Sequence, residues 1–94
     1  MNQTQPFKPF LLGRILITSS AEEVIERSDI DDALGRHARG DWGDLCPDDC
    51  RQNELALREG ERLFSAYIDR RETRFYVITK ADRSATAVVL LDEY

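Results

Sequence analysis

The chain has 94 residues, of which 41% are hydrophobic and 33% are charged. This length allows one domain and excludes two independent hydrophobic cores, and the composition is that of a globular protein rather than a disordered one. No apolar run approaches the roughly 20 residues that a membrane-spanning helix needs. The first residues have neither the basic start nor the apolar stretch of a signal peptide. We therefore expect a soluble, cytoplasmic, single-domain protein.

Charge is distributed unevenly along the chain. The formal net charge is −5, from 13 basic and 18 acidic residues. Residues 22–61 hold 13 acidic residues and 5 arginines, a balance of −8, whereas residues 1–21 carry +2 and residues 62–94 carry +1. This balance argues against direct nucleic-acid binding, which uses basic side chains to displace counterions. The acidic segment is either a solvated surface that keeps the protein soluble or a patch offered to a basic protein partner.

The N-terminal part is expected to be a flexible tail over residues 1–10, followed by a single α+β domain over residues 11–94. Residues 11–18 form a short run rich in aliphatic side chains, which predicts a first strand. Ser20 and Glu23 have the spacing of a capping box, which predicts a short helix with Ser20 as its N-cap.

Two further helices are predicted in the acidic segment. A second cap at Ser28 precedes apolar residues that recur at helical spacing over residues 30–38, and Gly40 suits the end of this helix. Pro47 suits the first position of a third helix, which we expect to end at Gly60.

The remainder of the chain changes to a strand-like pattern. Residues 63–68, 74–79 and 86–91 are three β-type runs, and their linkers have hairpin length. The last run is apolar on both faces, which favours a place in the middle of a sheet. The predicted fold is a small α+β domain of order β-α-α-α-β-β-β, with three short helices packed on one face of a mainly antiparallel four-stranded sheet.

The residues with metal or thiol chemistry form no complete site. Cys46 and Cys50 are one close pair, and zinc would also need His37 and a carboxylate such as Asp41 or Asp44, whereas structural zinc sites commonly use two close pairs. Cytoplasmic thiols stay reduced, so a disulfide is not expected either. His37 lies on the apolar face of its helix with no nucleophile at a recognisable spacing, and we interpret it as a buried structural histidine. We expect no metal and no cofactor.

Trp42 is the one tryptophan of the chain and lies in a predicted turn between Gly40 and Gly43. Such a residue either fills the seam between helices and sheet, which we favour, or stands out as a binding anchor. In the second case its acidic neighbours and the turn of the last hairpin would bind the partner with it. The candidate binding residues are Asp41, Trp42, Asp44, Asp48, Asp49, Arg83 and Ser84.

A ribonuclease is the alternative from a different class of function. Arginine side chains near hydroxyls can hold a phosphate, and Tyr67 or His37 could move protons in a small metal-independent enzyme that resembles RelE-like or barnase-like toxins. The acidic balance and the lack of a clear acid–base pair weigh against it. Its candidate residues are Tyr67, Arg74, Thr79, Arg83 and Thr86.

Two motifs carry a resemblance to a known family. A Gly-Asp-Trp-Gly turn lies within residues 37–45, and an Ala-Asp-Arg-Ser turn lies within residues 77–86. With these two turns in this order, the chain resembles a family of short bacterial proteins found on plasmids and other mobile elements. The likeness covers most of the chain from Gly13 onward. Members of the family are labelled plasmid-related protein or are named after a type I restriction endonuclease subunit. The chain is too short for a methyltransferase and has no glycine-rich cofactor loop, which excludes a restriction-modification enzyme. Leu91 stands where the family commonly has proline.

The resemblance implies an accessory role on a mobile element. Together with the acidic balance, it favours a non-enzymatic protein-interaction module. A specific version is an inhibitor that mimics the charge of a nucleic acid and occupies a host defence or DNA-processing protein.

Overall fold

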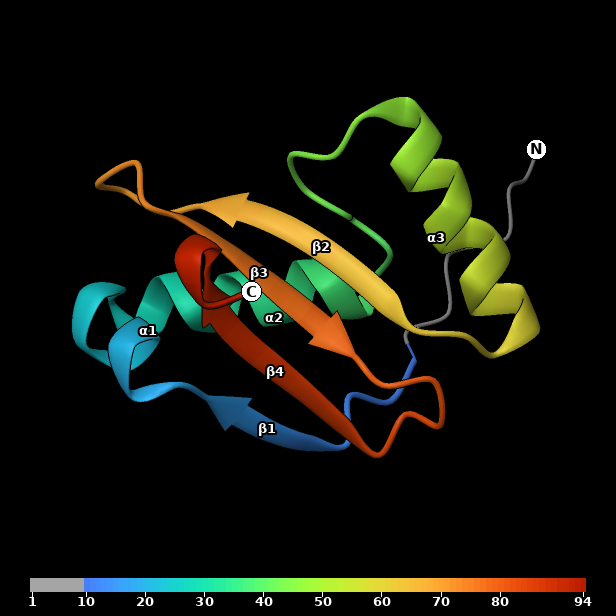
Figure 1. Cartoon of the computed structure of the whole chain (residues 1–94), viewed down its shortest axis with the longest axis horizontal. Helices are drawn as coiled ribbons and strands as arrows, with labels where there is room; N and C mark the ends of the chain where they lie inside the picture. The colour runs from blue at the N-terminus through green and yellow to red at the C-terminus, as the bar shows by residue number, and fades with distance from the viewer. Residues whose placement is uncertain (1–9) are drawn as a thin grey trace, which may run out of the picture.

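The computed structural model describes residues 10–94, and its elements follow the predicted order (Figure 1). The predicted tail over residues 1–10 lies outside the described residues, apart from Phe10. The elements are β1 (Arg14–Ile17), α1 (Ser19–Val24), α2 (Arg27–Ala38), α3 (Pro47–Glu59), β2 (Leu63–Ile68), β3 (Arg74–Thr79), β4 (Ala85–Leu90) and the 3-10 turn η1 (Leu91–Glu93).

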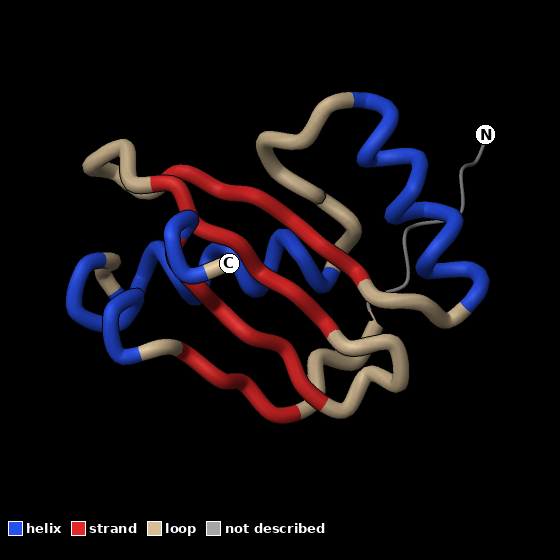
Figure 2. The backbone as a smooth tube through the Cα atoms, in the orientation of Figure 1, coloured by secondary structure: helices blue, strands red, loops and turns tan. Residues whose placement is uncertain are grey.

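The sheet has four strands in the order β1-β4-β3-β2 (Figure 2). Its two hairpins are antiparallel, and the pairing of β2 with β3 runs from Leu63 opposite Thr79 to Ile68 opposite Arg74. β1 pairs with β4 in parallel, so the sheet is mixed rather than purely antiparallel. The predicted α+β fold is confirmed, and β4 lies inside the sheet as its two apolar faces predict.

One face of the sheet is covered by α2, which runs across it (Figure 1). The core between them is built from the apolar stripe of α2 and the inward positions of β2, β3 and β4. Its largest apolar members are Ile25, Ile30, Leu34, Tyr67, Phe75, Val77 and Val88, of which Ile25 comes from the end of α1. We expected all three helices on this face, but α3 lies beside the edge strand β2 (Figure 1). Within the described structure, Asn53 is the one buried residue of α3, and Cys50, Ala56 and Leu57 are only half-buried, so this helix packs at the edge of the sheet rather than over its face.

The helix ends confirm some of the predicted caps and correct others. Pro47 begins α3, and Gly60 ends it in the left-handed conformation with φ of 72°. The capping box at Ser20 is wrong, because the N-cap of α1 lies two residues earlier, at Thr18, whose hydroxyl accepts the Ala21 N–H at 3.1 Å. α2 begins after Glu26 without a side-chain cap, so Ser28 lies inside the helix.

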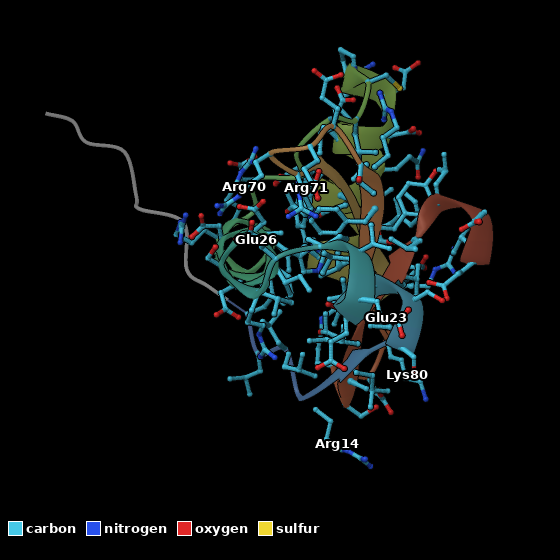
Figure 3. The ribbon with its side chains drawn as sticks, turned by 90° about the vertical axis from the view of Figure 1, so that its left-hand side faces the viewer. Arg14, Glu23, Glu26, Arg70, Arg71 and Lys80 are labelled. Carbon is cyan, nitrogen blue, oxygen red and sulfur yellow. The ribbon has the colours of Figure 1, made fainter. Side chains whose placement is uncertain are left out.

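A cluster of ion pairs joins the β2–β3 hairpin to the start of α2 (Figure 3). Arg70 reaches Asp29 at 2.9 Å and Glu26 at 3.2 Å, and Arg71 reaches Glu26 at 3.5 Å. The hydrogen bonds from Arg70 lower the pKa of the Asp29 carboxyl. Because both arginines are exposed, solvent screens these pairs and each adds little to stability. These pairs also reduce the local negative charge at the start of α2, because arginines of the C-terminal half lie beside carboxylates of the acidic segment.

Candidate functional site

Trp42 fills the seam between α2, α3 and the sheet. Its side chain is 4% exposed, and its Nε1–H donates to the Glu54 carboxylate at 2.8 Å. The ring of Phe10 stacks on it at 6.2 Å, and His37 meets it edge-on at 5.7 Å. The seam-filling interpretation is therefore the correct one. Trp42 is not available as a surface anchor, because its apolar ring and its polar N–H both have partners inside the protein.

The segment around Trp42 is bound to the edge of β2. The Ala66 N–H donates to the Trp42 carbonyl at 3.2 Å, and the Asp44 N–H donates to the Ala66 carbonyl at 2.7 Å. Gly43 between them has φ of 74°, and a Cβ there would lie 2.0 Å from the Ala66 oxygen. The turn therefore depends on glycine both for its conformation and for its approach to the strand.

The carboxylates near this turn are largely paired within the protein. Asp41 accepts two hydrogen bonds from Arg36, the shorter at 2.7 Å, and this pair lowers the pKa of the Asp41 carboxyl. Asp44 accepts from Arg74 at 2.6 Å. Of the four predicted acidic binding residues, only Asp49 has no ion-pair partner among residues 10–94. The pairs are Asp41–Arg36, Asp44–Arg74 and Asp48–Arg51.

Arg83 and Ser84 belong to the last hairpin, and Arg83 is directed toward backbone oxygens. Its guanidinium donates to the carbonyl of Glu61 at 2.7 Å and that of Ala56 at 3.4 Å, both at the end of α3. Ser84 is exposed, and its N–H donates to the Asp82 carboxylate. The seven predicted binding residues therefore do not form one exposed patch, because Trp42 is buried and Arg83 holds α3 to the hairpin.

A chain of buried hydrogen bonds runs from β2 through α2 to β4. The imidazole of His37 is 0% exposed and lies between Ser65, 2.5 Å from Nδ1, and Thr79, 2.8 Å from Nε2. The Thr79 hydroxyl is 2.8 Å from that of Thr86, which donates to the carbonyl of Leu12 at 2.7 Å. The prediction of a buried structural histidine is confirmed.

The direction of this chain follows from counting protons. The Thr86 proton is used on Leu12, so Thr79 must donate to Thr86, and Nε2–H of His37 must then donate to Thr79. Nδ1 faces the Ser65 hydroxyl, and in the neutral imidazole it accepts the Ser65 proton. Burial and the charge of Arg83 agree with this, since they lower the pKa of His37 to about 4.

The residues predicted for a ribonuclease do not meet at an accessible surface. Thr79 and Thr86 are 0% exposed, and Tyr67 is 2% exposed with its hydroxyl donating to the Asp41 carbonyl at 2.6 Å. Burial also raises the pKa of Tyr67 to about 12. Arg74 is exposed but paired with Asp44. The sequence pattern did not show which of these positions are buried and which are exposed. Alternation along a strand defines two faces but does not say which face is covered by a helix.

Neither cysteine takes part in a metal site within the described range. Cys46 is exposed and Cys50 is half-buried, and both are free thiols. Among residues 10–94, no three histidine, cysteine or carboxylate side chains lie close enough to hold a metal ion together. The helices in this range are all too short or too polar to cross a membrane.

A side chain that the sequence analysis did not single out attaches α3 to the sheet. Asn53 is 5% exposed, and its amide donates to the Phe64 carbonyl at 2.5 Å and accepts from the Phe64 N–H at 3.1 Å. It thereby satisfies both polar groups of an edge-strand residue, as a neighbouring strand would. In the sequence, Asn53 is a polar residue on the predicted third helix, and nothing in the helical pattern distinguishes it from its exposed polar neighbours.

The attachment of α3 leaves a groove between this helix, β2 and η1, which we call the α3 groove. Its volume is about 360 Å³. Apolar side chains form its floor and charged side chains form its rim. The apolar members are Leu45, Leu55, Ala56, Phe64 and Tyr94, and the charged members are Asp49, Glu61 and Arg62.

We expect Asn53→Ala to lower the free energy of unfolding by about 2–3 kcal/mol, because it leaves the N–H and the carbonyl of Phe64 without their partners. Urea unfolding monitored by circular dichroism measures this loss. The neighbouring Gln52 is exposed, so Gln52→Ala is the matched control and should change stability by less than about 0.5 kcal/mol. Equal effects of the two substitutions would contradict the role of Asn53.

Comparison with protein-family models, with curated proteins and with solved structures finds no match to this chain. The resemblance to plasmid-related proteins therefore stays a prediction based on the two turn motifs. The function has to be argued from the chain's own residues and their arrangement.

Proposed function

We propose that this protein is a non-enzymatic interaction module that binds a basic protein partner through the exposed side of α3 and the groove beside it. More narrowly, we propose that it is a cytoplasmic accessory protein of a bacterial mobile element. Its acidic surface would occupy the basic site of a host defence or DNA-processing protein, in place of a nucleic acid.

The observation that carries the proposal is the contrast between buried and exposed functional groups. The side chains with the chemistry for proton transfer, His37 and Tyr67, are buried and bonded to internal partners. The exposed groups around α3 are carboxylates and apolar side chains instead, with a smaller number of arginines. Residues 45–61 hold 5 acidic residues and 2 arginines, a balance of −3. This combination supports binding of a positively charged protein surface.

A nuclease-treated pull-down from bacterial lysate, read by mass spectrometry, tests the proposal. We expect a basic protein to be enriched and to elute with salt, because electrostatic contacts between exposed groups are screened. Asp49→Lys should reduce its recovery. Glu23→Lys is the matched control, since Glu23 is an exposed carboxylate of α1, far from α3 (Figures 1 and 3). Failure to enrich any protein would contradict an interaction module, as would metal-independent cleavage of labelled RNA by the purified protein.

A further inference from the structure

We infer that the α3 groove binds an extended segment of a protein partner that carries one large apolar side chain flanked by lysine or arginine. The inference rests on the proposed function and deepens it, because it assigns the binding surface and the chemistry of the segment. Three properties of the groove support it: its apolar floor, its negative rim and its rigid frame.

The floor of the groove continues into an aromatic cluster on the sheet face opposite α2. The ring of Phe64 lies 4.6 Å from that of Tyr76 and 5.3 Å from that of Tyr94. Tyr94 is 60% exposed and Leu55, across the groove, is 39% exposed. Exposed aromatic and aliphatic side chains around a hollow are typical of sites that take an apolar anchor from a partner.

The rim of the groove carries two carboxylates and one guanidinium, a balance of −1. Asp49 and Glu61 are exposed, and neither forms an ion pair with another residue in the 10–94 range. The one basic lining residue, Arg62, is turned onto Tyr94: it donates to the phenol oxygen at 2.8 Å and lies 5.8 Å from the ring centre. Carboxylates beside an apolar floor attract a segment with basic residues next to its anchor.

The same charges decide between classes of occupant. A nucleic acid would place phosphates beside Asp49 and Glu61, which repel them. A second copy of this chain would bring a net charge of −5 to a negative rim. A volume of about 360 Å³ lies near the low end of the usual range for binding pockets and suits one large side chain with its neighbours. A basic peptide segment therefore fits best.

The groove is held open by contacts that do not involve its occupant. Asn53 ties the middle of α3 to β2, Glu54 binds Trp42, and Arg83 binds the carbonyl of Ala56 near the end of the helix. All three contacts lie within residues 53–56, about one turn of α3, and fix the helix there. A frame that is ordered before binding reduces the entropy cost of association.

A selection of random dodecamer peptides displayed on phage, against the full chain, tests the inference. We expect enrichment of peptides that carry one Trp, Phe or Leu beside Lys or Arg. The best peptide is then synthesised with a fluorophore, and its Kd is measured by anisotropy. The double variant Asp49→Lys/Glu61→Lys and the variant Tyr94→Ser should each weaken binding by about tenfold or more, whereas Glu23→Lys should change it less than about twofold. Circular dichroism checks that each variant is folded.

Each other outcome overturns the inference in a recognisable way. Enrichment of acidic or uncharged peptides contradicts the assigned chemistry, and absence of enrichment contradicts a peptide-binding groove. Peptide binding that is unchanged in both groove variants places the site elsewhere. If those variants still recover a protein partner from lysate, the interaction module stands and the groove assignment fails. If neither peptide nor protein binds the unaltered chain, the proposed function fails as well.

Discussion

Replacing Gly43 by alanine is expected to lower the free energy of unfolding by at least about 3 kcal/mol. Gly43 has φ of 74°, a conformation that costs a non-glycine residue about 1–2 kcal/mol. The added Cβ would also lie 2.0 Å from the Ala66 carbonyl oxygen and 2.7 Å from the ring of Tyr67. Since the oxygen belongs to the backbone of β2, the turn has to move away from the strand, and its hydrogen bonds to Ala66 weaken.

Gly60 provides the matched control for this substitution. It has nearly the same φ, 72°, but a Cβ there would meet no atom within 4 Å. Gly60→Ala should therefore lose only the conformational cost, about 1–2 kcal/mol. Urea unfolding of both variants separates the steric contact from the backbone strain. Similar losses in the two variants would mean that the Trp42–Asp44 segment is not held against β2 as described.

The second large effect is on the pH dependence of stability. We expect the free energy of unfolding to fall by about 2 kcal/mol between pH 7 and pH 5 because of His37 alone. Its pKa is lowered from 6.5 to about 4 by burial and by Arg83. Between these values the unfolded chain binds a proton that the folded protein does not. The stability is thus fully present above pH 6.5 and is lost as the pH falls toward 4.

Carboxyl groups act in a lower range of pH. The pKa values of Asp29 and Asp41 are lowered by hydrogen bonds from Arg70 and Arg36, so their contribution is lost as the pH falls below their ordinary value of 3.8. The pKa of Glu93 is also lowered, from an ordinary value of 4.5, so the window from about pH 5.5 to 6.5 reports mainly on the imidazole. His37 is the only histidine of the chain, which makes the assignment direct.

Urea unfolding at several pH values, on the unaltered chain and on His37→Gln, measures the effect. The variant is expected to be less stable at pH 7, because glutamine does not reproduce both hydrogen bonds of the imidazole, but its stability should hardly change across the window. A titration of the ring by NMR should give the neutral form protonated at Nε2 at pH 7. A pKa near 6.5, or an unchanged pH slope in the variant, would contradict the buried chain of hydrogen bonds.

Local features of the sequence were sufficient for most of the fold. The runs over residues 63–68 and 74–79 became β2 and β3 with the predicted limits, because alternation of apolar side chains depends only on neighbouring residues. Pro47 and Gly60 mark the ends of α3, since each favours one backbone conformation in any context. The resulting order of elements defined the α+β class.

Choices between competing local signals were less secure. Ser20 and Ser28 both have the side chain and spacing of an N-cap, but Thr18 caps α1, and α2 begins after Glu26. The position of α3 beside β2 also depends on long-range contacts, those of Asn53 with Phe64, of Glu54 with Trp42 and of Arg83 with Ala56. Such contacts join residues distant in sequence and leave no periodic pattern.

For the candidate site, the amino-acid sequence shows which chemical groups are present: one histidine, one tryptophan and a middle segment in which acidic residues outnumber arginines. The tertiary structure decided which of these groups are available. It buried His37, Trp42 and Tyr67, and it paired Asp41 and Asp44 with arginines of other elements. The physical reason is that burial and ion pairing depend on which faces meet across the sheet, and that is a property of packing rather than of composition.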